Sequence, residues 1–302
     1  MTDSTAALAR SITRAGSKQS YYIARLMVDK GLVDDAFRAY AYLRWTDDVV
    51  DVVSRSRNES ISFIQRQLEL IDRLYSKEPP SDLTSEEEMV AVLISNDLGE
   101  LSGLQSFLRN MLAIIEFDAQ RKGKLISHQE LDWYTDVLSI SITDGLQYFI
   151  GHGHRYPAGG ARLLAAKAAH IAHLLRDHLQ DLTEGYINIP REYLETHSIN
   201  PDEVESPPFR AWVQDRVMLA RDYFTAGKEY FDRVDVLRFR IVTYWYWARF
   251  EGVLDMIERD GYVLRESYGE RRKFPTLLKI AWQGLSLPIR HVVGRGVSVL
   301  RP

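Results

Sequence analysis

The chain has 302 residues, 45% of them hydrophobic and 26% charged, with a formal net charge of −4. This composition is typical of a soluble globular protein and lacks the basic balance of a nucleic-acid-binding protein, so we expect no nucleic-acid partner. The chain has no cysteine, which excludes disulfides, thiolate metal sites and cysteine nucleophiles.

The two ends of the chain have distinct compositions. Residues 1–16 are polar and lack the apolar centre of a signal peptide, so we expect a flexible N-terminus. Residues 277–302 are basic, which suits either a solvated terminal helix or attachment to a membrane surface. No apolar run is long enough to span a bilayer. We therefore expect a cytoplasmic protein, either free or peripheral to a membrane.

Helical spacing of apolar residues dominates the chain between these ends, and no useful stretch alternates as a strand does. The sequence predicts one all-α domain over residues 1–302. The helices are predicted at residues 21–29, 33–53, 61–75, 89–98, 101–121, 129–150, 161–182, 191–196, 211–234 and 236–260.

Acidic residues gather on one face of the helix predicted at residues 33–53. Asp47 and Asp51 are four residues apart, Asp48 lies beside them, and Arg44 is one turn away. Carboxylates at this spacing repel each other by roughly 0.2–0.5 kcal/mol even on an exposed helix. One arginine cannot balance three acids, so this face suits a divalent cation.

A second helix repeats this design. Asp177 and Asp181 are four apart, with Arg176 alongside. Because Mg²⁺ is bound through one or two carboxylates, waters and substrate phosphates, the simplest shared ligand of two such helices is a Mg²⁺-bridged diphosphate. The competing interpretations are a solvated helix face and, for His170 and His173 with Asp177, a transition-metal site.

The order of several segments resembles the squalene/phytoene synthase family over about residues 17–273. The segments are SKQSYYIARL, RAYAYLRWTDDVVD, EFDAQRKG, LDWYTDVLSISITDGL, HLLRDHLQDLTEGYINIPREYL and IERDGYVLRESYGERRK. The resemblance implies a helical bundle of the isoprenoid-synthase type around a deep, central apolar cavity. In this family Mg²⁺ assists the ionisation of isoprenyl diphosphates, and two of them are joined head to head.

The resemblance also assigns roles to residues of this sequence. The implied metal ligands are Asp47, Asp48, Asp51, Asp177 and Asp181, and the implied catalytic residues are Asp47, Asp51, Tyr134, Asp177 and Asp181. The implied contacts to the diphosphate substrate are Lys18, Tyr21, Arg25, Arg44, His173, Arg176 and Arg265.

Four departures from the family pattern affect the second motif, the segment after it and the helix that follows Tyr134. His173 stands where the family has asparagine, and Gln180 where it has glutamate, so the second site has one anionic ligand fewer. Asn188 replaces a tyrosine, and residues 140–143 lack the family's pair of small glycines. These changes leave the prenyl chain length and the exact condensation open.

Three functions compete. The first is a Mg²⁺-dependent prenyltransferase (with Mn²⁺ as an alternative ion) that condenses two molecules of farnesyl or geranylgeranyl diphosphate. The second transfers one prenyl group to a different acceptor, such as an aromatic ring, or cyclises it. The third is a non-catalytic member of the family. NADPH dependence stays open, because the sequence has no glycine-rich nucleotide motif and this family would not need one.

Overall fold

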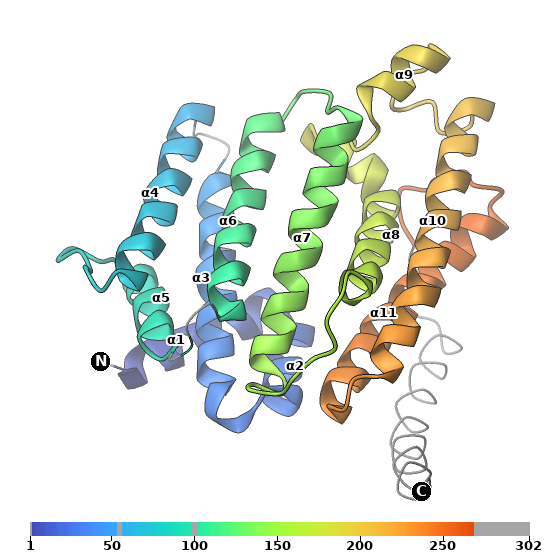
Figure 1. Cartoon of the computed structure of the whole chain (residues 1–302). Helices are drawn as coiled ribbons and strands as arrows, with labels where there is room; N and C mark the ends of the chain where they lie inside the picture. Colours follow the sequence, from blue (N-terminus) through green and yellow to red (C-terminus); the bar gives the residue numbers. More distant parts are fainter. Residues whose placement is uncertain (1, 53–55, 98, 100–101, 269–302) are drawn as a thin grey trace, which may run out of the picture. The chain divides into compact units, whose positions relative to one another are not determined.

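The computed structural model describes residues 2–52, 56–97, 99 and 102–268, and these residues form eleven α-helices, one short 3₁₀ helix and no strand (Figure 1). The all-α prediction is confirmed. The chain divides into two compact units, one of residues 1–122 and 140–154 and the other of residues 123–139 and 155–302. Each unit is described by itself below. The basic segment at residues 277–302 lies outside the described residues.

The first unit is built around α3, which packs against α1, α2, α4, α5 and α6. Phe37 and Tyr42, five residues apart, are buried on different sides of α3, as expected for a helix surrounded by others. The elements of this unit are α1 (Thr2–Gly16), α2 (Lys18–Met27), the 3₁₀ helix η1 (Lys30–Leu32), α3 (Val33–Val50), α4 (Arg57–Tyr75), α5 (Ser85–Ser95), α6 (Gly103–Arg121) and the second half of α7 (His128–Phe149).

The flexible N-terminus predicted for residues 1–16 is wrong for residues 2–16, because these residues form α1. Thr5, Ala6, Ala9 and Thr13 recur at helical spacing and are buried. Their small side chains allow α1 to lie close to α3, and the Thr13 hydroxyl donates to the carbonyl oxygen of Phe37 at 3.4 Å. Composition alone suggested a polar tail, but one face of the segment is apolar enough to pack.

The second unit contains α8 (Ala161–Glu184), α9 (Arg191–His197), α10 (Pro207–Asp232), α11 (Leu237–Arg259) and the first half of α7. α8 packs against α10 and α11. The pair α8–α10 approaches so closely that a Cβ on Gly227 would lie 2.8 Å from the Cβ of Ala165. A larger side chain at Gly227 would push α10 away from the helix that carries the second aspartate motif.

Local signals set the helix ends. Ser56 with Glu59, and Thr84 with Glu87, form capping boxes at the starts of α4 and α5. Gly185 ends α8 in the left-handed conformation, with φ of 89°. Because of the two capping boxes, α4 and α5 begin at Arg57 and Ser85, before the predicted starts at residues 61 and 89.

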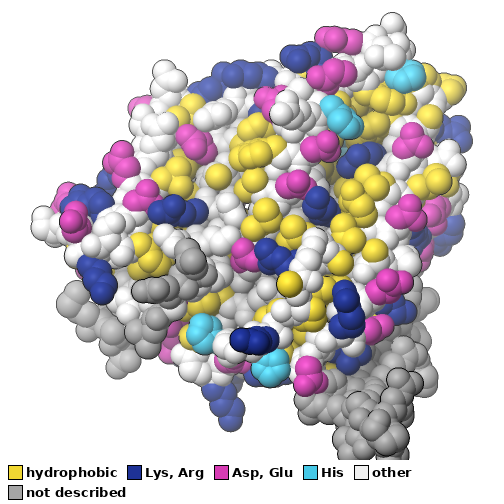
Figure 2. All heavy atoms as spheres, in the orientation of Figure 1, with side chains coloured by type: hydrophobic (Ala, Val, Ile, Leu, Met, Phe, Trp, Pro, Cys, Tyr) yellow, Lys and Arg dark blue, Asp and Glu magenta, His cyan; other side chains and the backbone are white. Residues whose placement is uncertain are grey.

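Charged side chains of both signs are mixed over the face of the molecule drawn in Figure 2, as expected for a chain with a small net charge. None of the described helices is long and apolar enough to cross a membrane.

Candidate functional site: two aspartate motifs

The first aspartate motif occupies the last turns of α3. The Arg44 guanidinium donates to Asp48 Oδ1 at 2.5 Å and lies 3.9 Å from Asp47 Oδ2. Asp51 follows the helix as its C-cap, and its backbone N–H donates to the carbonyl oxygen of Asp47 at 3.0 Å. The side chains of Asp47 and Asp48 are 46% and 55% exposed, so both carboxylates are accessible to a ligand.

Asp47 is the acid of this motif that is hardest to ionise. Burial and the charge of Asp51 raise the pKa of Asp47 to about 6, with Asp48 and Asp118 adding to the rise and Arg44 opposing it. Nearly half of the side chain is exposed, so solvent weakens both the effect of burial and the repulsion from the neighbouring acids. A site with excess negative charge and open carboxylates suits a divalent cation.

Asp118 was not among the predicted site residues, although it lies in the segment EFDAQRKG that carried part of the resemblance. It is on α6, which packs against α3 and α4. Arg121 donates from Nε to Asp118 Oδ1 at 2.7 Å, and this pair is largely buried. Arg57, at the start of α4, donates to the carbonyl oxygen of Lys122 at 2.6 Å. The C-terminal ends of α3 and α6 therefore lie at the same end of the first unit (Figure 1).

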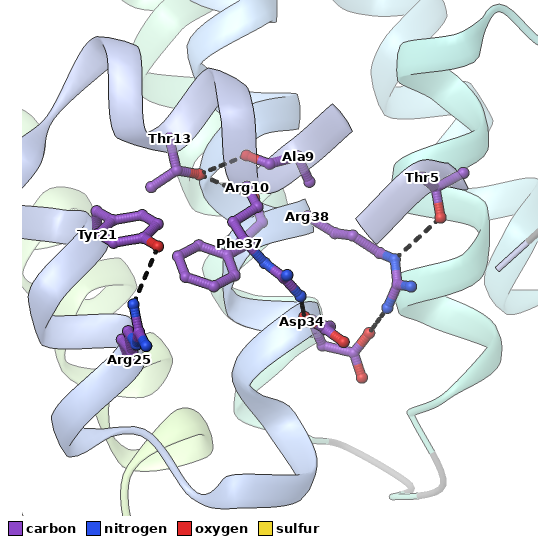
Figure 3. A network of polar contacts seen from close by, with 10 residues as sticks. Thr5, Ala9, Arg10, Thr13, Tyr21, Arg25, Asp34, Phe37 and Arg38 are labelled. Carbon is purple, nitrogen blue, oxygen red and sulfur yellow. Dashed lines mark hydrogen bonds and ion pairs between the residues drawn. The ribbon is translucent and has the colours of Figure 1, made fainter. Parts of the chain in front are cut away.

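The three predicted substrate-binding residues of α2 lie at different heights along the neighbouring helix α3. α2 starts beside Tyr40, because a Cβ on Gly16 would lie 3.1 Å from the Tyr40 hydroxyl. Lys18, the first residue of α2, is thus near the turn before Arg44. Figure 3 shows Tyr21 against Phe37, with ring centroids 5.3 Å apart, and Arg25 reaching the Tyr21 hydroxyl at 3.5 Å.

Phe37 precedes Asp47 by ten residues, which is about 15 Å along a helix. Tyr21 and Arg25 therefore belong to the corner between α1, α2 and α3, where Arg10 also pairs with Asp34 at 2.7 Å (Figure 3). Of the three predicted residues on α2, Lys18 lies nearest to the first motif. The role of all three in substrate binding stays a prediction.

The second aspartate motif lies on α8, and its first acid, Asp177, is hydrogen-bonded to two neighbouring side chains. Arg176 donates from Nε to Asp177 Oδ1 at 2.5 Å and from Nη2 to Oδ2. His173 Nε2 lies 2.9 Å from Asp177 Oδ2. Burial opposes ionisation of Asp177, but the hydrogen bonds from Arg176 and His173 outweigh it and hold the pKa of this carboxyl well below its usual range.

A second arginine, which the sequence analysis did not single out, lies beside Arg176. Arg249 is on α11, and its guanidinium is 5.8 Å from the centre of the Phe250 ring. The Arg176 guanidinium is 5.9 Å from the centre of the same ring. Burial lowers the pKa of Arg249 and the charge of Arg176 lowers it further, while Tyr246 and Asp177 oppose the shift. No local sequence signal pairs position 249 with position 176; only the packing of α8 on α11 does.

Asp181 is one turn after Asp177 and is oriented by the segment that follows α8. Asn188 is buried and donates from Nδ2 to Asp181 Oδ2 at 2.7 Å. Gln180 donates to Glu184 Oε1 at 2.9 Å, away from Asp181. The left-handed turn at Gly185 folds the chain back so that Asn188 reaches the carboxylate. The replacement of the family's tyrosine by Asn188 therefore supplies a hydrogen-bond donor to Asp181.

Two other predicted residues belong to the second unit. Tyr134 on α7 is buried. Its ring packs edge-on against the ring of His170 on α8, with the ring centroids 4.9 Å apart, and His170 is buried too. Arg265 follows α11 and pairs with Asp260. Tyr134 and Arg265 keep their predicted roles as hypotheses.

The metal assignment stays a prediction. Among the residues that the structure describes, no three His, Asp or Glu side chains are grouped closely enough to hold one ion. A Mg²⁺ ion needs only one or two protein carboxylates, so Asp47 and Asp51, with Asp48 beside them, fit such an ion. At the second motif the oxygens of Asp177 already accept from Arg176 and His173, so the donor set fits a metal less well.

The comparisons with known proteins agree with this architecture. The squalene/phytoene synthase family model matches residues 14–277, and the chain belongs to that family. Its members are prenyltransferase-type enzymes that use isoprenyl diphosphates and join prenyl groups head to head. No curated protein matches the chain in a sequence search.

Two solved structures share the fold. The crystal structure of squalene synthase HpnC from Alicyclobacillus acidocaldarius has a TM-score of 0.71 and 18% identity, over 87% of this chain and 97% of that chain. A dehydrosqualene synthase in complex with a ligand has a TM-score of 0.67 and 14% identity, over 94% of this chain and 96% of that chain. The predicted isoprenoid-synthase-type helical fold is thereby confirmed.

Proposed function

We propose that the chain is a Mg²⁺-dependent prenyltransferase that ionises isoprenyl diphosphates and condenses two of them head to head. The observation that carries this proposal is the acid excess at the end of α3. Asp51, Asp48 and Asp118 each raise the pKa of Asp47 there, and Arg44 opposes them, while Arg121 pairs with Asp118. Acids that outnumber their arginine partners in this way cost stability unless a ligand uses them.

In this proposal Asp47 and Asp51 hold Mg²⁺, which when bound neutralises the charge that develops on the leaving diphosphate. The residues of the chain supply the rest. Arg44 pairs with Asp48 and keeps its guanidinium at the mouth of the motif, where it can donate to a phosphate oxygen. Arg121 orients Asp118 through a hydrogen bond of 2.7 Å from its Nε to Asp118 Oδ1.

The test is product analysis. Purified protein would be incubated with farnesyl or geranylgeranyl diphosphate and Mg²⁺, and the organic extract examined by mass spectrometry. A C30 or C40 hydrocarbon supports the proposal. No release of diphosphate by the folded protein would contradict it and leave a non-catalytic member of the family.

A second candidate is transfer of one prenyl group to a different acceptor, or its cyclisation. The observation that favours it is the altered second motif, where Asp177 is already paired and Gln180 replaces an acid. Release of diphosphate together with a prenyl alcohol, a cyclic product or a prenylated aromatic acceptor would support this candidate over the condensation.

A further inference from the structure

The outward face of α2 is both apolar and basic. Its exposed side chains are those of Lys18, Gln19, Tyr22, Arg25 and Leu26. The opposite face of the helix is turned inward, where Tyr21 lies against Phe37 (Figure 3). The outward face therefore contributes nothing to the core of the first unit, and its composition needs another explanation.

Two large apolar side chains lie on this face. Leu26 is 62% exposed and Tyr22 is 56% exposed, and their spacing of four residues puts them on the same side of the helix. Elsewhere among the described residues, exposed large hydrophobic side chains occur singly, at Leu8, Val52, Leu125, Trp133 and Met218. Single exposed apolar side chains are ordinary, whereas an adjacent pair marks a candidate contact surface.

The charge around this pair is positive. Residues 4–33 hold five cations and one acid, in a chain with a net charge of −4. The acid, Asp29, accepts from the backbone N–H groups of Gly151 and His152 at 3.2 and 2.8 Å. Arg10 pairs with Asp34, the next acid along the chain. The other cations are exposed, and they are Arg14, Lys18, Arg25 and Lys30.

This combination fits an anionic lipid bilayer better than a second copy of the chain. Helices that lie in a membrane interface bury leucine and aromatic side chains at the acyl boundary, while lysine and arginine contact the anionic headgroups. Tyrosine, lysine and arginine suit that boundary because each has an apolar body and a polar end. In a symmetric dimer the same face would meet itself and bring Lys18 and Arg25 towards their own copies, which is unfavourable.

We propose that the outward face of α2 docks on an anionic membrane surface, with Tyr22 and Leu26 inserted at the headgroup boundary and the cations of α1, α2 and η1 near the lipid phosphates. Tyr22 and Leu26 belong to neither aspartate motif, and no role in substrate binding is predicted for them. The proposal is independent of the proposed function, because it concerns binding to a bilayer and not the reaction.

The first test is flotation of the full chain with phosphatidylcholine vesicles that contain phosphatidylserine. Leu26→Ser should lower the partition coefficient at least about tenfold, because burial of a leucine side chain contributes on this scale. The matched control is Met218→Ser, which removes a side chain of similar exposure, 57%, from α10 and should leave binding unchanged. Failure of the wild type to float, or equal flotation of the wild type and Leu26→Ser, would overturn the proposal.

The second test concerns charge. Lys18→Gln should lower the partition coefficient about fivefold, since each cation close to an anionic surface contributes on this scale. Lys228→Gln removes an exposed lysine from α10 and serves as the control. Equal loss of binding in the two variants would show a response to net charge alone and would overturn the assignment to α2.

The third test locates the contact directly and leaves most of the surface intact. Because the chain has no cysteine, an environment-sensitive dye can be attached at Leu26→Cys alone, with Met218→Cys as the control. Nitroxide-labelled lipids in the same vesicles should quench the dye at position 26 and spare the dye at position 218. Equal quenching at the two positions would contradict docking through α2.

A second copy of the chain is the alternative occupant of this face. Analytical ultracentrifugation without lipid would then show a dimer that Leu26→Ser dissociates, and such a dimer with unchanged flotation of Leu26→Ser would overturn the proposal. Failure of the proposed function is read separately. If no prenyl product forms but Leu26→Ser still floats less than the wild type, the proposed function fails and the membrane surface stands.

Discussion

Asp47 and Asp177 occupy equivalent places in two motifs of the same spacing, yet their surroundings act in opposite directions. Burial and the charges of Asp51, Asp48 and Asp118 raise the pKa of Asp47 to about 6. Asp177 is bound by Arg176 and His173, and its pKa falls below the usual range. The spacing of the acids therefore does not decide how easily each acid ionises. The side chains within one turn on the same helix decide it, and Asp118 of α6 adds to the rise at Asp47.

The largest expected effect is on activity at the acid-rich motif. Replacing both Asp47 and Asp51 by asparagine should lower kcat at least about 100-fold, because groups that stabilise the charge of the leaving diphosphate contribute on this scale. Steady-state assays with an isoprenyl diphosphate and Mg²⁺ would measure it. Asp72→Asn, an exposed acid on α4 of the same unit, serves as the control and should keep full activity.

The second-largest expected effect is on thermal stability, which should respond in opposite directions to the charges of Asp47 and Asp177. At pH 7 the raised pKa of Asp47 means that its charge destabilises the fold, and this penalty sets in as the pH rises through about 6. The lowered pKa of Asp177 means that its charge stabilises the fold, and this stability is lost as the pH falls below the ordinary carboxyl range.

Asp177→Asn should therefore lower the free energy of unfolding by about 1–2 kcal/mol, and Asp47→Asn should raise it slightly. Calorimetric melting at pH 7 would measure both, with Asp215→Asn on the exposed face of α10 as the control. Equal destabilisation by the two substitutions would remove the contrast between the motifs.

A smaller effect is expected from restoring an acid to the second motif. Gln180→Glu adds a negative charge one turn from Arg176 and next to Glu184 on the same helix face. We expect the melting temperature to fall slightly, because the new carboxylate faces Glu184 four residues on and like charges at this spacing destabilise a helix by about 0.2–0.5 kcal/mol. A gain in Mg²⁺-dependent activity would indicate that this motif is a weakened metal site.

The smallest expected effect concerns the acid limb of the pH profile. Mg²⁺-dependent activity should decline as the pH falls through about 6, because protonated Asp47 cannot hold a cation. Asp118→Asn removes one of the charges that raise this pKa and should move the midpoint to lower pH by a fraction of a unit. An unchanged midpoint would show that Asp118 does not act on Asp47.

Sequence reasoning located the two acidic helices, the arginines within them and the family. Each of these depends on residues that are close in the chain, because acids four apart share a helix face. The predicted start of α4, residue 61, is four residues late, because the Ser56–Glu59 capping box was not used. The same reasoning missed α1 as a packed helix, because burial of Thr5 and Ala9 depends on the partner helix and not on the polarity of the segment.

Only the tertiary structure added Asp118 to the first motif and Arg249 to the second. Asp118 lies more than sixty residues from Asp47, whose pKa it helps to raise, and Arg249 lies more than sixty residues from Asp177, whose charge acts on it. The sequence by itself determined the helices, the spacing of the acids and the charged neighbours within one turn, because those follow from local hydrogen bonding and periodicity. The packing of α6 on α3 and of α11 on α8 decided how deeply each acid is buried and which distant charges lie beside it, because burial and charges act through space.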